Sequence, residues 1–285
     1  MGTVPDAEQP TLDAVRHRIE RYFDAAPQES AAVEAHGPFT IFISHAPWPY
    51  YARPRLHRHG DDDQHLAISA ADVRQVIRRQ RELGVAICVE WQHELVPELA
   101  TVAAAAGLSV RLRPLLMHDR TLQLPLGLDG WNVDVLTAGE SEIGRIRAVA
   151  AVGWRQVDTS VGPAGASARD AEPLDVAGAD FSLAELADGR RSMAVVRSAR
   201  DGAVAVGTHR PCGDVTEIVG VAVLPAFRRR GLAGALTALL VDDAYARGIA
   251  TVMLTAESDA VARIYERVGF QRIGFTGEAV PAEQA

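Results

Sequence analysis

Three consecutive arginines precede a glycine and a run of small and apolar residues in the stretch 227-FRRRGLAGAL-236. Leucines at helical spacing predict a helix that begins just after Gly231. The first turn of a helix exposes N–H groups without intrahelical partners and carries a partial positive charge, which attracts anions. Gly231, Ala233 and Gly234 would let a phosphate approach the backbone closely, and the arginines would add donors. The stretch therefore predicts an anion site, with a solvated charge run or close helix packing as the alternatives.

The stretch differs from the common nucleotide-binding loops. No lysine follows Gly234, as GxxxxGK[ST] requires, and the pattern is not GxGxxG. Serine, histidine and aspartate occur in no recognisable nucleophile motif, so hydrolase chemistry has no support. Nucleic-acid binding by the arginines is disfavoured, because the net charge is −8 and no aromatic residues are interleaved with them.

Composition places the chain among globular proteins, with 285 residues of which 48% are hydrophobic. No apolar run reaches the length of a membrane span, and the N-terminus does not resemble a signal peptide. The two cysteines, Cys88 and Cys212, lie far apart and have no CxxC partner. We therefore expect a cytoplasmic protein with no metal site, no disulfide scaffold and no membrane association.

The elements around the arginine stretch are a preceding strand and a following helix. The segment "EIVGVAVLP" ends a predicted strand over 215–224, and the helix over 231–247 stops at Gly248. Further patterns predict strands at 133–138, 191–198, 202–209, 251–256 and 270–276, and helices at 140–152, 182–188 and 259–267. The stretch 159–180, poor in large apolar residues, is predicted to be a surface loop.

The first part of the chain has its own alternation of helices and strands. Ser69 and Asp72 form a predicted capping box at the start of a helix over 70–83. Other patterns predict helices at 11–26 and 96–106, and strands at 38–44, 85–91 and 109–116. His45, Trp48, Tyr50 and Tyr51 form an aromatic group that either plugs this first core, the reading we favour, or lines a pocket between the two parts.

A faint internal repeat relates the two parts. "AAAAGLSVRL" (103–112) can be laid over "YERVGFQRIG" (265–274), so that Gly107 matches Gly269. The segment "HLAIS" before helix 70–83 has neither the arginines nor the glycines of the later loop. The repeat predicts that the first part is a relative that has lost its site; the alternative is that helix, glycine and strand form a common junction.

Two motifs on neighbouring elements resemble one known family. The arrangement Arg228-x-x-Gly231-x-Ala233, entering a helix after a strand, resembles the acetyl-coenzyme A signature of the GCN5-related N-acetyltransferase (GNAT) superfamily. "ARIYERVGF" (262–270) looks like the other hallmark of that family, a helix that carries a tyrosine and ends in Gly-Phe. The resemblance covers about residues 131–276.

The resemblance implies an α/β fold with two GNAT-like units, each a mixed, mostly antiparallel sheet flanked by helices. Residues 1–118 would be a degenerate N-terminal unit, 119–130 a connector and 131–285 the catalytic domain. Such a tandem arrangement is found in some members of the family. The sequence does not decide between a monomer and a homodimer.

The resemblance also implies which residues bind acetyl-coenzyme A. The loop should cradle the pyrophosphate through Arg228, Arg229, Arg230, Gly231, Leu232, Ala233 and Gly234. The strand edge Val221, Ala222 and Val223 should pair with the pantetheine arm like an added strand, in a splay between this strand and strand 251–256. Ser258 stands where many relatives carry an asparagine that contacts the cofactor, and it is shorter.

Acetyl transfer to an amine needs a general base, because an ammonium group has a pKa near 10.4, and an acid for the departing thiolate. Tyr265 stands at the family's acid position; its alternative is a core aromatic. Strand alternation places Glu217 on a partly buried face, which would raise its pKa toward that of a useful base; its alternative is an ordinary carboxylate paired with Arg197. Glu257 is the second candidate base. A backbone N–H near Val221 would stabilise the oxyanion.

We therefore expect an N-acetyltransferase that acts by direct attack in a ternary complex. Small amines and peptide or protein amines all remain possible acceptors. The acidic residues of segment 154–190 hint at a cationic acceptor; they are Asp158, Asp170, Glu172, Asp175 and Asp180. The alternative from another class is a non-catalytic sensor or interaction module that binds coenzyme A.

Overall fold

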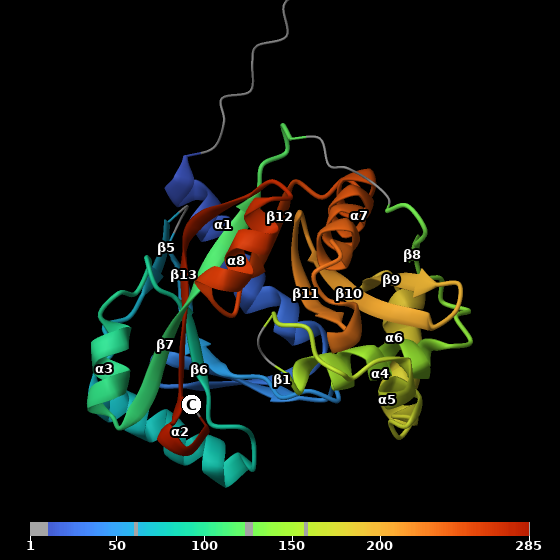
Figure 1. Cartoon of the computed structure of the whole chain (residues 1–285). Coiled ribbons are helices and arrows are strands. Elements are labelled where there is room, and N and C mark those ends of the chain that lie inside the picture. Colours follow the sequence, from blue (N-terminus) through green and yellow to red (C-terminus); the bar gives the residue numbers. More distant parts are fainter. Residues whose placement is uncertain (1–10, 60–61, 123–127, 157–158, 285) are drawn as a thin grey trace, which may run out of the picture.

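The computed structural model describes residues 11–59, 62–122, 128–156 and 159–284. Its main feature is a sheet of eleven strands in the order β1-β2-β3-β6-β13-β7-β12-β11-β10-β9-β8, with helices packed against it (Figure 1). The α/β class with a mixed, mostly antiparallel sheet is thus confirmed. No helix among the described residues is long and apolar enough to cross a membrane.

Among the described residues, the first part of the chain supplies five strands of this sheet. Its helices are α1 (Leu12–Ala25), α2 (Ala70–Leu83) and α3 (Leu99–Ala105). Its strands are β1 (Ala31–His36), β2 (Phe39–Ser44), β3 (Ala52–Pro54), β6 (Val89–Gln92) and β7 (Leu108–His118), with a separate hairpin of β4 (Leu56–His59) and β5 (Asp62–His65). A 3₁₀ turn, η1 (Ala26–Glu29), follows α1.

The second part carries the longer strands next to the arginine stretch. Its helices are α4 (Ile143–Trp154), α5 (Ala166–Asp170), α6 (Val176–Ala187), α7 (Leu232–Ala246) and α8 (Asp259–Glu266). Its strands are β8 (Asn132–Val135), β9 (Ser192–Ser198), β10 (Gly202–Cys212), β11 (Val215–Val223), β12 (Thr251–Thr255) and β13 (Phe270–Pro281). Two 3₁₀ turns, η2 (Pro225–Phe227) and η3 (Ala282–Gln284), follow β11 and β13.

The predicted loop over 159–180 is wrong, because α5 and the start of α6 lie within it. Asp175 caps α6 by accepting a hydrogen bond from Gly178 N at 2.9 Å. Arg169 on α5 is buried and donates to the carbonyl oxygens of Asp201 and Ala203. The helices are therefore tied to the sheet by polar contacts, which a search for large apolar residues does not detect.

The two parts exchange their last strands. β13 ends the chain, yet it pairs antiparallel with β6 and β7 of the first part. β7 in turn pairs with β12, so it joins the sheet of the second part. In Figure 1 the red β13 runs beside the green β7. β13 extends to Pro281, beyond the predicted end at 276, because both neighbours supply hydrogen-bonding partners that local sequence does not reveal.

The core follows this exchange. Leu116 of β7 packs in the cluster formed mainly by the second part, and Ala279 of β13 packs in the cluster of α2, α3 and β6. A third cluster joins α1 to Leu115, Val215 and Met253. The sequence predicted a sheet in each unit, whereas the strands form one continuous sheet. The division at 118 and 131 stays a prediction.

Candidate active site

A cleft of about 1130 Å³ lies along β11, the 227–234 loop and α8. Residues of the first part close it on the other side, from α1, β6 and β7. Both parts of the chain therefore build the cleft.

The cleft exists because β11 and β12 separate. Their parallel pairing runs from Val215–Thr251 only to Glu217–Met253, although β11 continues to Val223. Within the described part of the chain no strand pairs with the rest of β11 on that side. The predicted splay is present, and the backbone of Val221, Ala222 and Val223 lines the cleft.

A β-bulge shapes the same strand. Val206 pairs with Ala222 and Thr208 with Val219, so one residue of β10 faces two residues of β11, Gly220 and Val221. Gly220 has φ of +68°, a left-handed conformation that favours glycine. The bulge bends β11 and re-aims its backbone groups at the point where the cleft begins.

The N-terminus of α7 is open to an anion. Gly231, with φ of +79°, is the N-cap and has no side chain to accept from the first turn, which also contains no acidic residue. Leu232, Ala233 and Gly234 line the cleft. Their N–H groups precede the first intrahelical bond, which Ala235 N makes to Gly231 O. The start of α7 thus offers donors and partial positive charge to the cleft.

The corresponding helix of the first part is closed. Ser69 Oγ accepts from Asp72 N at 3.3 Å, and Asp72 Oδ2 accepts from Ser69 N at 2.9 Å. The N-terminus of α2 is therefore occupied by a carboxylate of the helix itself, whereas the N-terminus of α7 has room for an external anion. The predicted capping box is confirmed, and it explains physically why this helix end offers no anion site.

The three arginines of the loop have different surroundings. Arg228 donates to Gly153 O at 2.7 Å and to Gln156 O at 2.8 Å, which holds the end of α4 against the loop. Arg230 lies over the Phe227 ring and is not among the residues lining the cleft. Arg229 is exposed, lines the cleft and has φ of +64°, a strained conformation for a residue with a side chain. Of the three, Arg229 is best placed to meet an anion.

Tyr265 on α8 lines the cleft, and its hydroxyl makes no hydrogen bond with another described residue. Its ring meets Phe270 edge to face, with centroids 6.1 Å apart. Burial raises the pKa of Tyr265 to about 12, so the phenol keeps its proton near neutral pH. Ser258 instead caps α8 by accepting from Val261 N, and it lies outside the lining of the cleft.

Glu217 projects from β11 into the cleft and makes no ion pair or hydrogen bond through its carboxylate with a described residue. Burial, reinforced by the nearby Glu90, raises the pKa of Glu217 to about 7. The alternative for Glu217 was an ion pair with Arg197. Arg197 instead pairs with Glu140 at 2.8 Å. Glu217 is therefore an unpaired carboxylate that can exchange a proton near neutral pH.

Glu257 also lines the cleft, but its carboxylate is ion-paired. Its Oε1 lies 3.2 Å from Arg111 and its Oε2 3.5 Å from Arg113. Both oxygens thus have a cationic partner within the protein.

Five described residues of the first part line the cleft although the sequence had not assigned them to the cofactor or catalytic site: Phe23, Tyr51, Glu90, Arg111 and Arg113. Glu90 had a detectable signal, because it is the one charged residue in the apolar run "VAICVEW". Tyr51 belonged to the group expected to plug the first core, but it lines the cleft, and Trp48 contacts Phe181 of α6. That expectation is wrong for both residues.

The acidic residues of segment 154–190 do not form the cleft's acidic lining. Among the described ones, Asp170, Glu172 and Asp175 pair with Arg169, Arg155 and Arg147, respectively. Asp158 lies outside the described residues. The negative charge in the cleft comes from Glu90, Glu217 and Glu257 instead.

One group of described residues has donor atoms close enough for a metal ion, namely Cys88, Glu90 and Glu278, within 4.8 Å of one another. Arg113 already pairs with both carboxylates. Burial raises the pKa of the Cys88 thiol, which disfavours the thiolate that a metal binds. The donor set does not favour a metal.

Comparison with known proteins agrees with the features of the cleft. Residues 167–270 match the Acetyltransferase (GNAT) family. No curated protein shows a significant match. A GCN5-related N-acetyltransferase from Kribbella flavida is 20% identical, with 94% of this chain and 96% of that chain covered and a TM-score of 0.68.

Two further solved structures share the fold. A tandem GNAT protein from the clavulanic acid biosynthesis pathway is 12% identical, with 97% of this chain and 89% of that chain covered and a TM-score of 0.54. A GCN5-related N-acetyltransferase-like protein from Streptococcus suis is also 12% identical, with coverages of 95% and 99% and a TM-score of 0.53. The matched residues 167–270 include the open start of α7, the splayed β11 and Tyr265, so this part of the chain is similar to the Acetyltransferase (GNAT) family, and the whole chain shares the fold of these solved structures.

Proposed function

We propose that the protein is an N-acetyltransferase that moves the acetyl group of acetyl-coenzyme A to a primary amine by direct attack. Glu217 is the general base and Tyr265 the general acid. The observation that carries the proposal is that an unpaired carboxylate with a pKa of about 7 and a protonated phenol without a partner line the same cleft. Glu257 is the weaker candidate base, because Arg111 and Arg113 already occupy both of its carboxylate oxygens.

The lining of the cleft fits the cofactor. The free N–H groups at the start of α7 suit a pyrophosphate, and Arg229 adds positive charge beside them. The unpaired edge of β11 over 221–223 suits the amides of the pantetheine arm. Bound there, the thioester would supply an activated acetyl group.

The chain's own groups then have separate tasks. Glu217 accepts the proton of the incoming ammonium group, which makes the amine nucleophilic. A backbone N–H of β11 near the bulge donates to the acetyl oxygen as negative charge develops on it. Tyr265 donates its proton to the sulfur as the C–S bond breaks, and the second proton that the nitrogen loses on forming the amide restores the phenol. Cys212 has a raised pKa through burial and does not line the cleft, which favours direct attack over transfer through an enzyme thiol.

We also propose that residues 1–118 are a degenerate GNAT-like unit, 119–130 a connector and 131–285 the catalytic unit. The strand order supports this, since β3, β6 and β13 on one side mirror β11, β12 and β7 on the other. Each of the two parts contains one parallel pair, β3–β6 and β11–β12. The closed N-terminus of α2 fits a unit that has lost its cofactor.

The test is the release of free thiol from acetyl-coenzyme A by the purified chain, alone and with a panel of amines. An enzyme gives slow release alone and faster release with an acceptor, and Glu217→Gln should reduce the stimulated rate 100-fold or more. Glu98→Gln, an exposed carboxylate outside the cleft, is the matched control. Tight binding of the cofactor with no release under any condition would instead favour the non-catalytic sensor.

A further inference from the structure

The cleft has an uncompensated negative charge where the first part of the chain closes it. Arg111 pairs with Glu257 at 3.2 Å and with Glu278 at 2.6 Å. Arg113 lies 3.1 Å from Glu278, 3.4 Å from Glu90 and 3.5 Å from Glu257. Two guanidinium groups are thus shared among three carboxylates.

Glu217 adds a fourth carboxylate, which makes no ion pair or hydrogen bond with a described residue. With all four ionised, the group carries two more negative than positive charges. The other arginines whose charge reaches Glu217 are themselves paired: Arg53 with Glu20 at 3.1 Å, and Arg210 with Glu185 at 3.1 Å. Among the described residues, the two guanidinium groups that bind these carboxylates directly therefore leave an excess of negative charge.

Glu90 and Glu217 face a common space from different parts of the chain. Glu90, Glu217 and Tyr51 all line the cleft. The charge of Glu90 helps to raise the pKa of Glu217, and both carboxylates help to raise the pKa of the Tyr51 hydroxyl. Burial raises the pKa of Glu90 as well. Like charges in one poorly solvated space repel each other, and a cation that enters between them relieves the repulsion.

Aromatic side chains limit the size of this space. Phe23 and Tyr51 line it, and the guanidinium of Arg53 lies 4.6 Å and 5.7 Å from their ring centroids. Arg53 is buried and is held by Glu20, so the two rings have a fixed support. The Tyr51 hydroxyl has no hydrogen-bond partner among the described residues, which leaves it able to accept from or donate to a ligand.

We propose that this end of the cleft is the acceptor subsite and that it takes a compact amine with a second positive charge, such as a short diamine or an amino-guanidine. Glu90 binds the second charge, while Glu217 receives the proton of the reacting amine. The inference rests on the proposed function, because it deepens the acceptor side of that reaction. It also gives the first part of the chain a task, since Glu90, Tyr51 and Phe23 all belong to it.

The charge pattern disfavours an acceptor with a carboxylate. Such a group would need a free guanidinium, but Arg111 and Arg113 each already have at least two carboxylate partners. Arg229, Arg263 and Arg267 also line the cleft, and Arg229 precedes the open start of α7 in the chain. The lining therefore contains cationic groups that suit an anionic cofactor as well as the carboxylates that suit the acceptor.

The first experiment is titration calorimetry of the coenzyme A-saturated protein with matched ligands. The ligands are diamines of three to six carbons, the monoamine of each length, 4-aminobutanoate and 4-aminobutylguanidine. At least one dication should bind 10-fold or more tightly than its monoamine, and 4-aminobutanoate should bind most weakly. The proposal is overturned if every dication binds no better than the monoamine of equal length.

The second experiment uses Glu90→Gln, with Glu98→Gln as the control for loss of a carboxylate outside the cleft. Glu90→Gln should lower the ratio of kcat/KM for the best dication to that for its monoamine by about 10- to 100-fold, the size expected for a charge-assisted contact. Tyr51→Phe removes only a hydroxyl and should weaken dication binding several-fold even if Glu90→Gln folds poorly. An unchanged ratio in a folded Glu90→Gln protein would refute the role of Glu90.

The two proposals fail separately. Dication binding that depends on Glu90, with no thiol release from acetyl-coenzyme A, would remove the catalytic function and keep the subsite. Efficient acetylation of monoamines, with no preference for a second charge, would keep the acetyltransferase and remove the subsite.

Discussion

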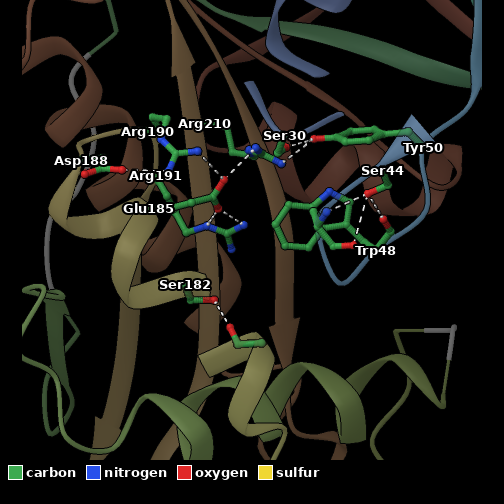
Figure 2. Close-up of polar contacts among 12 residues, drawn as sticks. Ser30, Ser44, Trp48, Tyr50, Ser182, Glu185, Asp188, Arg190, Arg191 and Arg210 are labelled. Carbon is green, nitrogen blue, oxygen red and sulfur yellow. Dashed lines mark hydrogen bonds and ion pairs between the residues drawn. The ribbon is translucent and has the colours of Figure 1, made fainter. Parts of the chain in front are cut away.

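Trp48 of the first part and Phe181 of α6 meet edge to face, with ring centroids 5.1 Å apart. The Trp48 indole also contacts the guanidinium groups of Arg191 and Arg210, at 4.9 Å and 5.0 Å from its centroid. Figure 2 shows both arginines directed to the buried carboxylate of Glu185, which they bind at 2.6 Å and 3.1 Å. The contact therefore joins the two parts of the chain through aromatic packing and an ion-pair network. This connection is separate from the one made by the exchanged strands β7 and β13.

Replacing Trp48 with alanine should destabilise the fold by about 1–3 kcal/mol, because the change removes apolar burial and two cation–π contacts. The melting temperature should fall by about 2–4 °C for each kcal/mol. Trp48→Phe should lose less, since an aromatic edge remains for Phe181. Chemical denaturation of both variants checks this, and equal stability of wild type and Trp48→Ala would show that the contact is only incidental.

Gly231→Asp should abolish acetyl-coenzyme A binding, because it puts a carboxylate at the anion site and forces a side chain into a conformation with φ of +79°. In the wild type, cofactor at about a hundred times its Kd should add about 2.7 kcal/mol of stability. Gly248→Asp is the matched control: φ there is +81°, at the other end of α7. Both variants should lose stability without ligand, but only Gly248→Asp should keep the cofactor-induced rise in melting temperature.

The pH dependence of kcat/KM should follow Glu217. Because burial raises its pKa to about 7, the rate should rise as pH increases through about 7 and the carboxylate becomes the base. The Glu217→Gln variant should lose this rise in the pH–rate profile together with most of the activity. If kcat/KM of the wild type instead rose around pH 4.5, the Glu217 carboxylate would not be buried in solution as it is in this structure.

The same carboxylate should lower stability at high pH. Its folded pKa is above the unfolded value of 4.5, so the folded state binds more protons between these two pH values, and stability falls as pH rises from about 4.5 to 7. Above that window Glu217→Gln should be more stable than the wild type by about 1–3 kcal/mol. The gap should close near pH 4, which denaturation at pH 4 and pH 8 would show.

Tyr265→Phe should lower kcat by about 10²- to 10³-fold through loss of the proton donor. The hydroxyl has no partner among the described residues, so its removal should cost little stability and leave the Kd of the cofactor nearly unchanged. Steady-state kinetics and calorimetry separate the two quantities. Wild-type turnover by the variant would remove Tyr265 from the mechanism.

A fragment of residues 131–285 alone should not form the native fold. It lacks β7, so β12 and β13 lose their common neighbour and two core clusters lose Leu115 and Leu116. Exposed strand edges of this kind promote aggregation. Co-expression with residues 1–130 should restore a soluble complex, and a soluble, cooperative fragment 131–285 would contradict the importance of the strand exchange.

Local patterns were sufficient for the elements that bind the cofactor. Glycine and apolar spacing placed α7 within one residue at each end, and the alternation in "EIVGVAV" placed Glu217 on a partly buried face of β11. Helix starts, helix periods and left-handed glycines depend on neighbours within a few residues, so they can be read from the chain. The prediction of a loop over 159–180 was wrong because the helices there are held by Arg169 and Asp175 rather than by an apolar stripe.

The sequence by itself determined the open start of α7 and the presence of Tyr265 and Glu217 on neighbouring elements. Only the tertiary structure decided that β7 and β13 change places, that Glu257 is paired while Glu217 is not, and that Glu90 and Tyr51 reach the same cleft. The reason is physical: the proton affinity of a carboxylate and the partner of a strand depend on groups brought together from more than a hundred residues away. No local pattern records those neighbours.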